Sequence, residues 1–303
     1  NDFYSHERTV AVSHSSLVRI MELRAIHIFR APVGGLFRHV RDLTRGQGER
    51  GVHVGIVCDS STGGELAESA FRSLQPCCDL GLHRIPMQRR PGRSDLRVIR
   101  QLEQICRKQS PNILHGHGAK GAAYARLLAH RVGARAICTP HGGSLHFSYS
   151  TPRGAAYLGL ERLLKRRTDG SLFESEFARQ AYLRKIGPAR FPSRVVHNGL
   201  YDEEFDRLPN HDAQYDFVFV GELRTLKGVH VLVDALARIA QQRNVRLLIV
   251  GAGAEEASIK SRIRDLGVDK QVDFAAPVSP VTEALARGRC IVIPSLAESL
   301  PYI

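Results

Sequence analysis

The stretch Val220–Leu236, VGELRTLKGVHVLVDAL, joins a strand pattern to a helix pattern through a short turn that contains glycine. The largely apolar run Asp216–Val220 predicts a buried strand, and apolar positions after Gly228 recur with a helical period. Arg224 and Lys227 stand immediately before this helix, whose N-terminus already carries partial positive charge. Two cations placed there raise the local energy unless an anion binds between them, so the stretch indicates an anion site.

Outward from this stretch, strand and helix patterns alternate, which is typical of parallel sheets covered by helices on both faces. We expect a first domain in 21–198, a polar linker in 199–214 and a second domain in 215–303. The predicted strands are Arg24–Phe29, Val52–Cys58, Leu82–Pro86, Asn112–His115, Ala134–Thr139, Gly170–Phe173, Arg194–His197, Asp216–Val220, Arg246–Val250, Gln271–Phe274 and Cys290–Ile293. The expected α/β fold is two doubly wound domains facing across a cleft, with ligands at the carboxyl ends of the strands.

The two ends of the sequence carry separate expectations. Residues 1–20 are rich in Ser, His and Arg without a continuous apolar core, so we expect a disordered leader and no signal peptide. The second domain has only four predicted strands, and a typical doubly wound domain has one or two more βα units. We therefore expect this domain to be incomplete, with Cys290–Ile293 as an apolar sheet edge.

Composition favours a cytoplasmic protein with an acidic partner. The 303 residues are 43% hydrophobic, and no stretch has the apolar length of a membrane span. Forty-three Lys and Arg against thirty Asp and Glu give a net charge of +13. The basic residues cluster in Arg84–Lys108 and Arg162–Arg167, where the scarcity of aromatic side chains argues against nucleic acid. Two interpretations of these basic clusters stay open. They either form a solvated helix face or bind the anionic surface of a membrane peripherally, at its inner face.

The six cysteines show neither a C-x-x-C pair nor zinc spacing, which fits a reducing cytosol. Cys58, Cys138 and Cys290 lie in strand patterns. We expect these three side chains to be core thiols.

Two glycine-rich turns are candidates for ligand contact. Gly34 and Gly35 follow the first strand, where they either let the backbone approach an anion or simply form a tight turn. Gly251 and Gly253 resemble the start of a dinucleotide fingerprint, but Glu256 occupies the third glycine position. We interpret this second turn as one against which a nucleotide or phosphate can lie.

Three histidines and one glutamate follow predicted strands. His115 and His117 come just beyond one strand, and His141 stands at the carboxyl end of the next. Because no carboxylate or cysteine stands at a fixed spacing from them, we expect no metal and interpret them as polar groups lining the cleft. Glu298 follows the last strand and is either solvated or in contact with a ligand hydroxyl.

The ordered motifs resemble the retaining glycosyltransferases of family 4, which have the GT-B fold of two Rossmann-like domains. The motifs are GGLFRHV, TPHGG, HNGLYDEEF, GELRTLKG, VGAG and PSLAESLPY, in family order and at family spacing across Arg24–Ile303. The resemblance implies a hexosyltransferase that moves a sugar from a nucleotide-diphosphate sugar to a glycolipid or polysaccharide precursor. It implies cell-surface polysaccharide synthesis, and neither metal nor other cofactor.

The resemblance also implies roles for individual residues. Lys227, with help from Arg224, would hold the diphosphate of the donor as it leaves, and His141 would hydrogen-bond the donor sugar. Glu298 matches the first glutamate of the family's E-x7-E pair, which contacts the donor sugar; the second would fall beyond Ile303. The implied donor-site residues are Gly34, Gly35, Asn198, Gly221, Gly251, Gly253, Ser299 and Leu300.

One departure from the family pattern keeps other functions open. Glu222 stands where the family often has arginine, with Arg224 further on. A sugar-nucleotide or lipid-binding module with a decayed site is therefore one alternative. Because the second glutamate of the family pair would fall beyond Ile303, weak or absent activity is expected of this chain. A non-hydrolysing UDP-sugar epimerase would need acidic proton shuttles in the first domain, and an NAD-dependent dehydrogenase rests on Gly251 and Gly253 alone.

Overall fold

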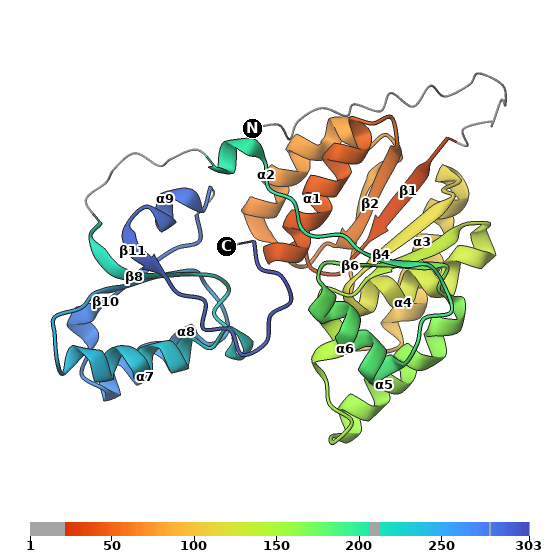
Figure 1. Cartoon of the computed structure of the whole chain (residues 1–303). Coiled ribbons are helices and arrows are strands. Elements are labelled where there is room, and N and C mark those ends of the chain that lie inside the picture. Colours follow the sequence, from red (N-terminus) through yellow and green to blue (C-terminus); the bar gives the residue numbers. More distant parts are fainter. Residues whose placement is uncertain (1–21, 206–212, 279, 303) are drawn as a thin grey trace, which may run out of the picture.

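The computed structural model describes residues 22–205, 213–278 and 280–302, which form two α/β lobes (Figure 1). The first lobe has a seven-stranded sheet in the order β3-β2-β1-β4-β5-β6-β7, and the second has a four-stranded sheet in the order β10-β9-β8-β11. Every strand pairing is parallel. The predicted leader, residues 1–20, lies outside the described residues, as does part of the predicted linker.

All eleven predicted strands are present, with bounds that differ by two residues at most. The strands are β1 (Arg24–Ile28), β2 (His53–Asp59), β3 (Leu82–Ile85), β4 (Ile113–His117), β5 (Arg135–Thr139), β6 (Gly170–Phe173), β7 (Ser193–Val195), β8 (Tyr215–Val220), β9 (Leu247–Val250), β10 (Val272–Ala275) and β11 (Gly288–Ile291). The helices are α1 (Gly34–Gly48), α2 (Gly64–Leu74), α3 (Ser94–Gln109), α4 (Gly118–Leu128), α5 (Pro152–Leu164), α6 (Glu176–Ile186), α7 (Val229–Ala240), α8 (Glu256–Asp265) and α9 (Thr282–Leu285).

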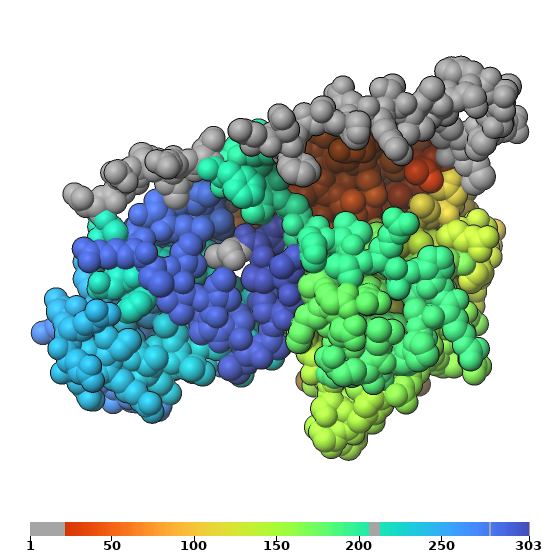
Figure 2. Space-filling model, in the orientation of Figure 1, coloured from red at the N-terminus to blue at the C-terminus, as the bar shows by residue number. Residues whose placement is uncertain are grey.

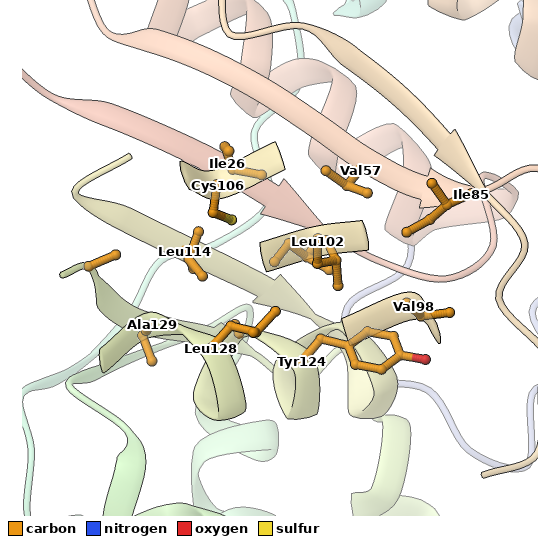
Figure 3. Close-up of a cluster of buried hydrophobic side chains, with 14 of the residues drawn as sticks. Ile26, Val57, Ile85, Val98, Leu102, Cys106, Leu114, Tyr124, Leu128 and Ala129 are labelled. Atoms are coloured by element: carbon orange, nitrogen blue, oxygen red, sulfur yellow. The ribbon is translucent and has the colours of Figure 1, made fainter. Parts of the chain in front are cut away.

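Helix α3 illustrates how the sequence pattern builds the core of the first lobe. It buries Val98, Leu102 and Cys106, which recur every fourth residue on one face of the helix. These side chains pack in one cluster with Ile26 of β1 and Leu114 of β4 (Figure 3). Burying a side chain of this size contributes about 1.5–3 kcal/mol, so the cluster holds the central strands in place.

The second lobe repeats this arrangement with α7. Its buried residues, Val229, Leu232, Val233 and Leu236, follow the helical period read from the sequence. They pack against the central strands β8 and β9. The strand β8 and the helix α7 are therefore joined rigidly through the turn that contains both predicted cations.

The cysteine prediction is correct at two positions and wrong at the third. Cys58 and Cys138 are buried, whereas Cys290 is exposed. The reason is that β11 lies at the end of its sheet, where Ile291 is 44% exposed as well. The expected apolar sheet edge is thus present at β11. Among the described residues, no helix is both long enough and apolar enough to cross a bilayer.

Candidate functional site

Lys227 and Glu298 meet at the edge of the second lobe. Lys227 ends the short 3-10 helix η6 (Thr225–Lys227), and its ammonium forms an ion pair with the Glu298 carboxylate. The Ser295 hydroxyl donates to the same carboxylate at 3.3 Å. The side chains of the pair are 21% and 30% exposed, so solvent reaches both. Two predicted site residues, 71 positions apart in sequence, are therefore in direct contact.

A glycine allows this contact. Gly228 links η6 to α7 with a φ of +67°, in the left-handed region. A Cβ on Gly228 would stand 2.1 Å from the carbonyl oxygen of Pro294. The segment after β11 is fastened further by the Leu296 N–H, which donates to the Leu226 carbonyl at 2.9 Å. Only glycine therefore fits where this segment crosses the start of α7.

Arg224 is also paired with a carboxylate. Its Nε lies 3.4 Å from Glu222, and both side chains are about half exposed, which makes the pair weak. Burial lowers the pKa of His146 in the first lobe, and the charge of Arg224 adds to that shift. The two cations read from the sequence are thus each balanced by a carboxylate, Lys227 by Glu298 and Arg224 by the residue that departs from the family pattern.

The glycines of the second lobe pack against one another. A Cβ on Gly251 would stand 1.9 Å from the carbonyl oxygen of Gly221, and one on Gly253 would stand 2.2 Å from that of Leu223. The Leu223 N–H donates to the Ala252 carbonyl at 2.9 Å. Close packing of the turns after β8 and β9 is therefore sufficient to explain Gly251 and Gly253. Their predicted contact with a nucleotide stays a prediction.

The segment Ser299–Tyr302, hereafter the bridging segment, joins the second lobe to the first. The Ser299 hydroxyl lies 2.9 Å from that of Ser175, which follows β6. The Asn198 amide donates to the Leu300 carbonyl at 3.0 Å. Figure 2 shows the dark-blue end of the chain in contact with the first lobe. Three predicted site residues, Asn198, Ser299 and Leu300, therefore meet where the two lobes join.

Tyr302 continues the bridging segment onto helix α1. The Arg38 guanidinium lies 4.7 Å from the centre of the Tyr302 ring, and the Tyr302 hydroxyl is 3.4 Å from Nδ1 of His39. A Cβ on Gly35 would touch the Tyr302 ring at 3.4 Å, whereas the Gly34 position is open. Gly34 starts α1 with a φ of +63°. The two predicted glycines thus lie at a helix N-terminus beside the bridging segment.

The hydrogen bonds of Asn198 fix the orientation of its amide. The Leu300 carbonyl can only accept, so the Asn198 Nδ2 group must face it. The Asn198 oxygen then faces Nδ1 of His39 at 3.1 Å, and that nitrogen is the donor. Asn198 therefore ties α1 to the bridging segment in a single arrangement.

The histidines lie deeper than the sequence predicted. His115 and His117 belong to strand β4 and are buried at 3% and 1% exposure, so their predicted place on the cleft lining is wrong. The reason is that β4 extends to His117, which places both side chains beneath the strand ends. His141 is partly exposed, and its Nε2 lies 3.2 Å from Nδ1 of His117. Burial lowers the pKa of all three imidazoles well below the usual value.

Two trios of imidazoles have the spacing of metal ligands. The ligand nitrogens of His27, His115 and His117 lie within 4.8 Å of one another, as do those of His39, His117 and His141. The same rings also make hydrogen bonds to one another, to Gln47, to Thr139 and to Asn198. Hydrogen bonding is thus sufficient to account for the arrangement, and the expectation of no metal stays a prediction.

Sequence reasoning missed Glu174, which directly follows β6. Its side chain is 2% exposed, and neither carboxylate oxygen has a hydrogen-bond partner of standard geometry among the described residues. Burial raises the pKa of Glu174, and the nearby hydroxyl of Ser299 and the backbone N–H of His141 oppose this shift. The position at the carboxyl end of a strand was the available signal, because that edge gathers ligand-binding groups. His27, His39 and Tyr302 were missed as well.

A separate basic hollow lies at the opposite edge of the first sheet. It measures about 360 Å³ and is lined by Arg126, Leu127, His130, Arg131 and Arg167. These residues precede β5 and β6, so they stand at the amino ends of the strands. Ligands of open α/β sheets bind at the carboxyl ends, so the hollow is not assigned to the site.

The fold resembles solved glycosyltransferases. Anabaena HepE in complex with UDP and glucose superposes with a TM-score of 0.71 at 17% identity, covering 91% of this chain and 76% of that chain. Sucrose-phosphate synthase from Thermosynechococcus elongatus gives 0.72 at 18% identity, covering 93% and 77%. At these identities the likeness shows the fold alone, which is GT-B as predicted.

Relatives and family models agree with this fold. EpsD of Bacillus subtilis (strain 168) is 28% identical over 238 residues, which are 71% of this chain and 61% of EpsD. The D-inositol 3-phosphate glycosyltransferase of Corynebacterium efficiens is 37% identical over 95 residues, 28% of this chain and 22% of that enzyme. The matched region thus spans less than two thirds of each of these relatives. The model of Glycosyltransferase Family 4 matches residues 33–204, and that of Glycosyl transferases group 1 matches 201–303. Since these matches cover more than half of the sequence, the chain belongs to glycosyltransferase family 4.

Proposed function

We propose that this chain carries the two lobes of a retaining glycosyltransferase that moves a sugar from a nucleotide-diphosphate sugar to an acceptor hydroxyl. The observation that carries the proposal is the pairing of Lys227 with Glu298 at the start of α7, beside the bridging segment. A cation at a helix N-terminus suits a diphosphate, and a carboxylate next to it suits the hydroxyls of a sugar. The solved relative HepE is described in complexes with UDP and UDP-glucose, which supports a donor of this class.

Donor binding exchanges the partners of Lys227. The diphosphate pairs with the Lys227 ammonium in place of Glu298. The Glu298 carboxylate can then accept hydrogen bonds from the sugar hydroxyls. As the bond between the diphosphate and the sugar breaks, negative charge grows on the diphosphate next to Lys227. Arg224, which stands shortly before Lys227 in the sequence, helps to stabilise this charge. Such preorganised charge contributes about 3–4 kcal/mol to a transition state. The acceptor oxygen bonds to the sugar carbon on the face from which the diphosphate leaves, and the proton of the acceptor hydroxyl passes to the leaving diphosphate. The sugar configuration is therefore retained.

A nucleotide panel tests this function. We expect calorimetry with UDP, GDP, ADP and NAD to show binding of a nucleoside diphosphate and none of NAD. With the full-length protein, a donor that carries the same base should then support transfer to an acceptor hydroxyl. Binding without transfer would favour the sugar-nucleotide-binding module. Binding of NAD alone, or of nothing in the panel, would refute the proposal.

The acceptor we propose is a glycolipid or polysaccharide precursor at an anionic membrane surface, on the cytoplasmic side. The exposed basic residues of the two clusters are Arg89, Arg90, Arg93, Arg97, Arg100, Arg107, Lys108, Arg162, Arg166 and Arg167. Arg162 stands near the end of α5, beside Leu160 and Leu163, which are 44% and 62% exposed. Arg166 and Arg167 follow directly after this helix. Exposed leucines among arginines are typical of a surface that lies on a membrane.

Vesicle binding tests this surface. Replacing Arg162, Arg166 and Arg167 by glutamine is expected to weaken binding to vesicles with phosphatidylglycerol by about 1 kcal/mol for each arginine, measured by co-sedimentation. The matched control replaces three exposed arginines of the second lobe, Arg243, Arg264 and Arg289, and should leave binding unchanged. Equal losses in both triple variants would show that total charge, and not this surface, binds the lipid.

A further inference from the structure

Four side chains form a hydrogen-bonded line from the core of the first lobe to its ligand edge. Oε1 of Gln47 lies 2.8 Å from Nε2 of His27. Nδ1 of His27 lies 3.0 Å from Nε2 of His117, and Nδ1 of His117 lies 3.2 Å from Nε2 of His141. The line thus passes from α1 through β1 and β4 to the turn after β5. His27 and His117 are buried, and His141 is the partly exposed end.

The line has a direction because a neutral imidazole has one donor and one acceptor nitrogen. Burial keeps the rings neutral and lowers the pKa of His27 to about 4. The structure places the oxygen of the Gln47 amide toward His27. Because an oxygen can only accept, this orientation of the amide puts the proton on Nε2 of His27, whose Nδ1 then accepts from Nε2 of His117. Nδ1 of His117 then accepts from Nε2 of His141. The remaining nitrogen of His141, Nδ1, is left with a lone pair.

We propose that Gln47, His27 and His117 are positioning residues that hold His141 in the Nε2–H form, so that its Nδ1 accepts a hydrogen bond from a ligand hydroxyl. That the ligand is a sugar rests on the proposed function, whereas the tautomer does not. An acceptor nitrogen favours a hydroxyl and disfavours a carboxylate or carbonyl oxygen at the same place, because two lone pairs repel. The hydrogen-bonded line therefore selects among nucleotide sugars. It favours a sugar that places a hydroxyl, rather than a carboxylate or carbonyl oxygen, next to Nδ1 of His141.

The backbone supports a positioning role. His141 has a φ of +49°, one of two positive values among the described non-glycine residues. A residue in the left-handed region costs about 1–3 kcal/mol and persists only where its surroundings hold it. Gly142 and Gly143 continue the turn at positive φ. The hydrogen bond from Nε2 to His117 is a contact that fixes the ring of this strained residue.

Ring nitrogen spectra test the tautomer without any ligand. The ¹⁵N shifts of histidine-labelled protein at pH 8 are expected to show His141 with Nε2 protonated, its signals assigned by their loss in His141→Gln. Gln47→Met removes the acceptor that sets the direction, so both His141 tautomers should appear. Gln47→Glu keeps an acceptor at the same place and is the matched control, with the wild-type tautomer expected.

Three results would overturn the proposal. These are a proton on Nδ1 of His141 in the wild type, an unchanged tautomer in Gln47→Met, and stoichiometric zinc in the purified protein, since the nitrogens would then be metal ligands. In the enzyme assay, Gln47→Met should raise KM for the nucleotide sugar about twofold, because only about half of the molecules then carry the tautomer that accepts from the sugar hydroxyl, and should leave Kd for the nucleoside diphosphate unchanged. If no nucleotide binds any variant, the proposed function fails and the spectra alone decide the tautomer.

Discussion

Replacing Lys227 with alanine is expected to weaken nucleoside diphosphate binding by about 100-fold and to slow sugar transfer by about 10²–10³-fold. Lys227 is the cation at the start of α7, and its partner Glu298 carries negative charge of its own. Without the ammonium, the incoming diphosphate meets that carboxylate with no charge between them. Calorimetry with the preferred nucleoside diphosphate measures the first effect, and donor-dependent transfer measures the second.

The control for this variant is Lys270→Ala. Lys270 is an exposed lysine of the second lobe in the turn before β10, so the substitution removes the same charge and the same side chain away from the carboxyl ends of the strands. Its binding and transfer should match the wild type. Wild-type affinity in Lys227→Ala would place the diphosphate elsewhere and remove the basis of the proposed donor site.

Replacing Glu161 with alanine is expected to lower the free energy of unfolding by about 3–5 kcal/mol. Arg126 of α4 donates to Glu161 of α5 at 2.6 Å, and the Ser144 hydroxyl donates to the other carboxylate oxygen at 2.9 Å. The Arg126 and Glu161 side chains are 3% and 9% exposed. Removing the carboxylate leaves a buried guanidinium without its counter-charge. Urea unfolding followed by circular dichroism gives the change.

The matched control is Glu176→Ala at the start of α6. Glu176 also pairs with an arginine, Arg179, but their side chains are 54% and 37% exposed. An ion pair exposed to solvent in this way contributes little to stability, so the control should unfold almost as the wild type does. A loss below 1 kcal/mol in Glu161→Ala would mean that water or a shifted side chain satisfies Arg126.

The sheets could be predicted from the sequence because their strands are buried on both faces. A run such as Leu247–Val250 is apolar throughout, and its neighbours are helices whose period is equally plain. The same pattern predicted which edge of the sheets carries the site, because that edge is defined by the carboxyl ends of the strands. Cys290 marks the limit of this reasoning, because a strand pattern does not say whether the strand lies inside the sheet or at its edge.

The contacts within the site could not be predicted in the same way. The sequence marked Lys227 as a cation that needs an anion but did not show that Glu298 supplies it. His27 reads as one polar residue in an apolar strand, and only the order of the sheet brings it next to His117. Glu174 was open to prediction from its place after β6. That neither Glu174 oxygen has a hydrogen-bond partner of standard geometry among the described residues is a property of the surrounding packing, which no local pattern records.

The bridging segment has a consequence for exchanging parts between related enzymes. The second family match begins at residue 201. A chimera designed from the sequence would therefore take Ser299–Tyr302 from the enzyme that supplies the second half. In space these residues belong to the other half, where they rest on Ser175, Asn198 and Arg38. In a hybrid joined at 201, residues of the other enzyme would replace Ser299–Tyr302 in these contacts with the native first half. A transplant that keeps the native Ser299–Tyr302 with the native first half respects the real module boundary, which is discontinuous along the chain.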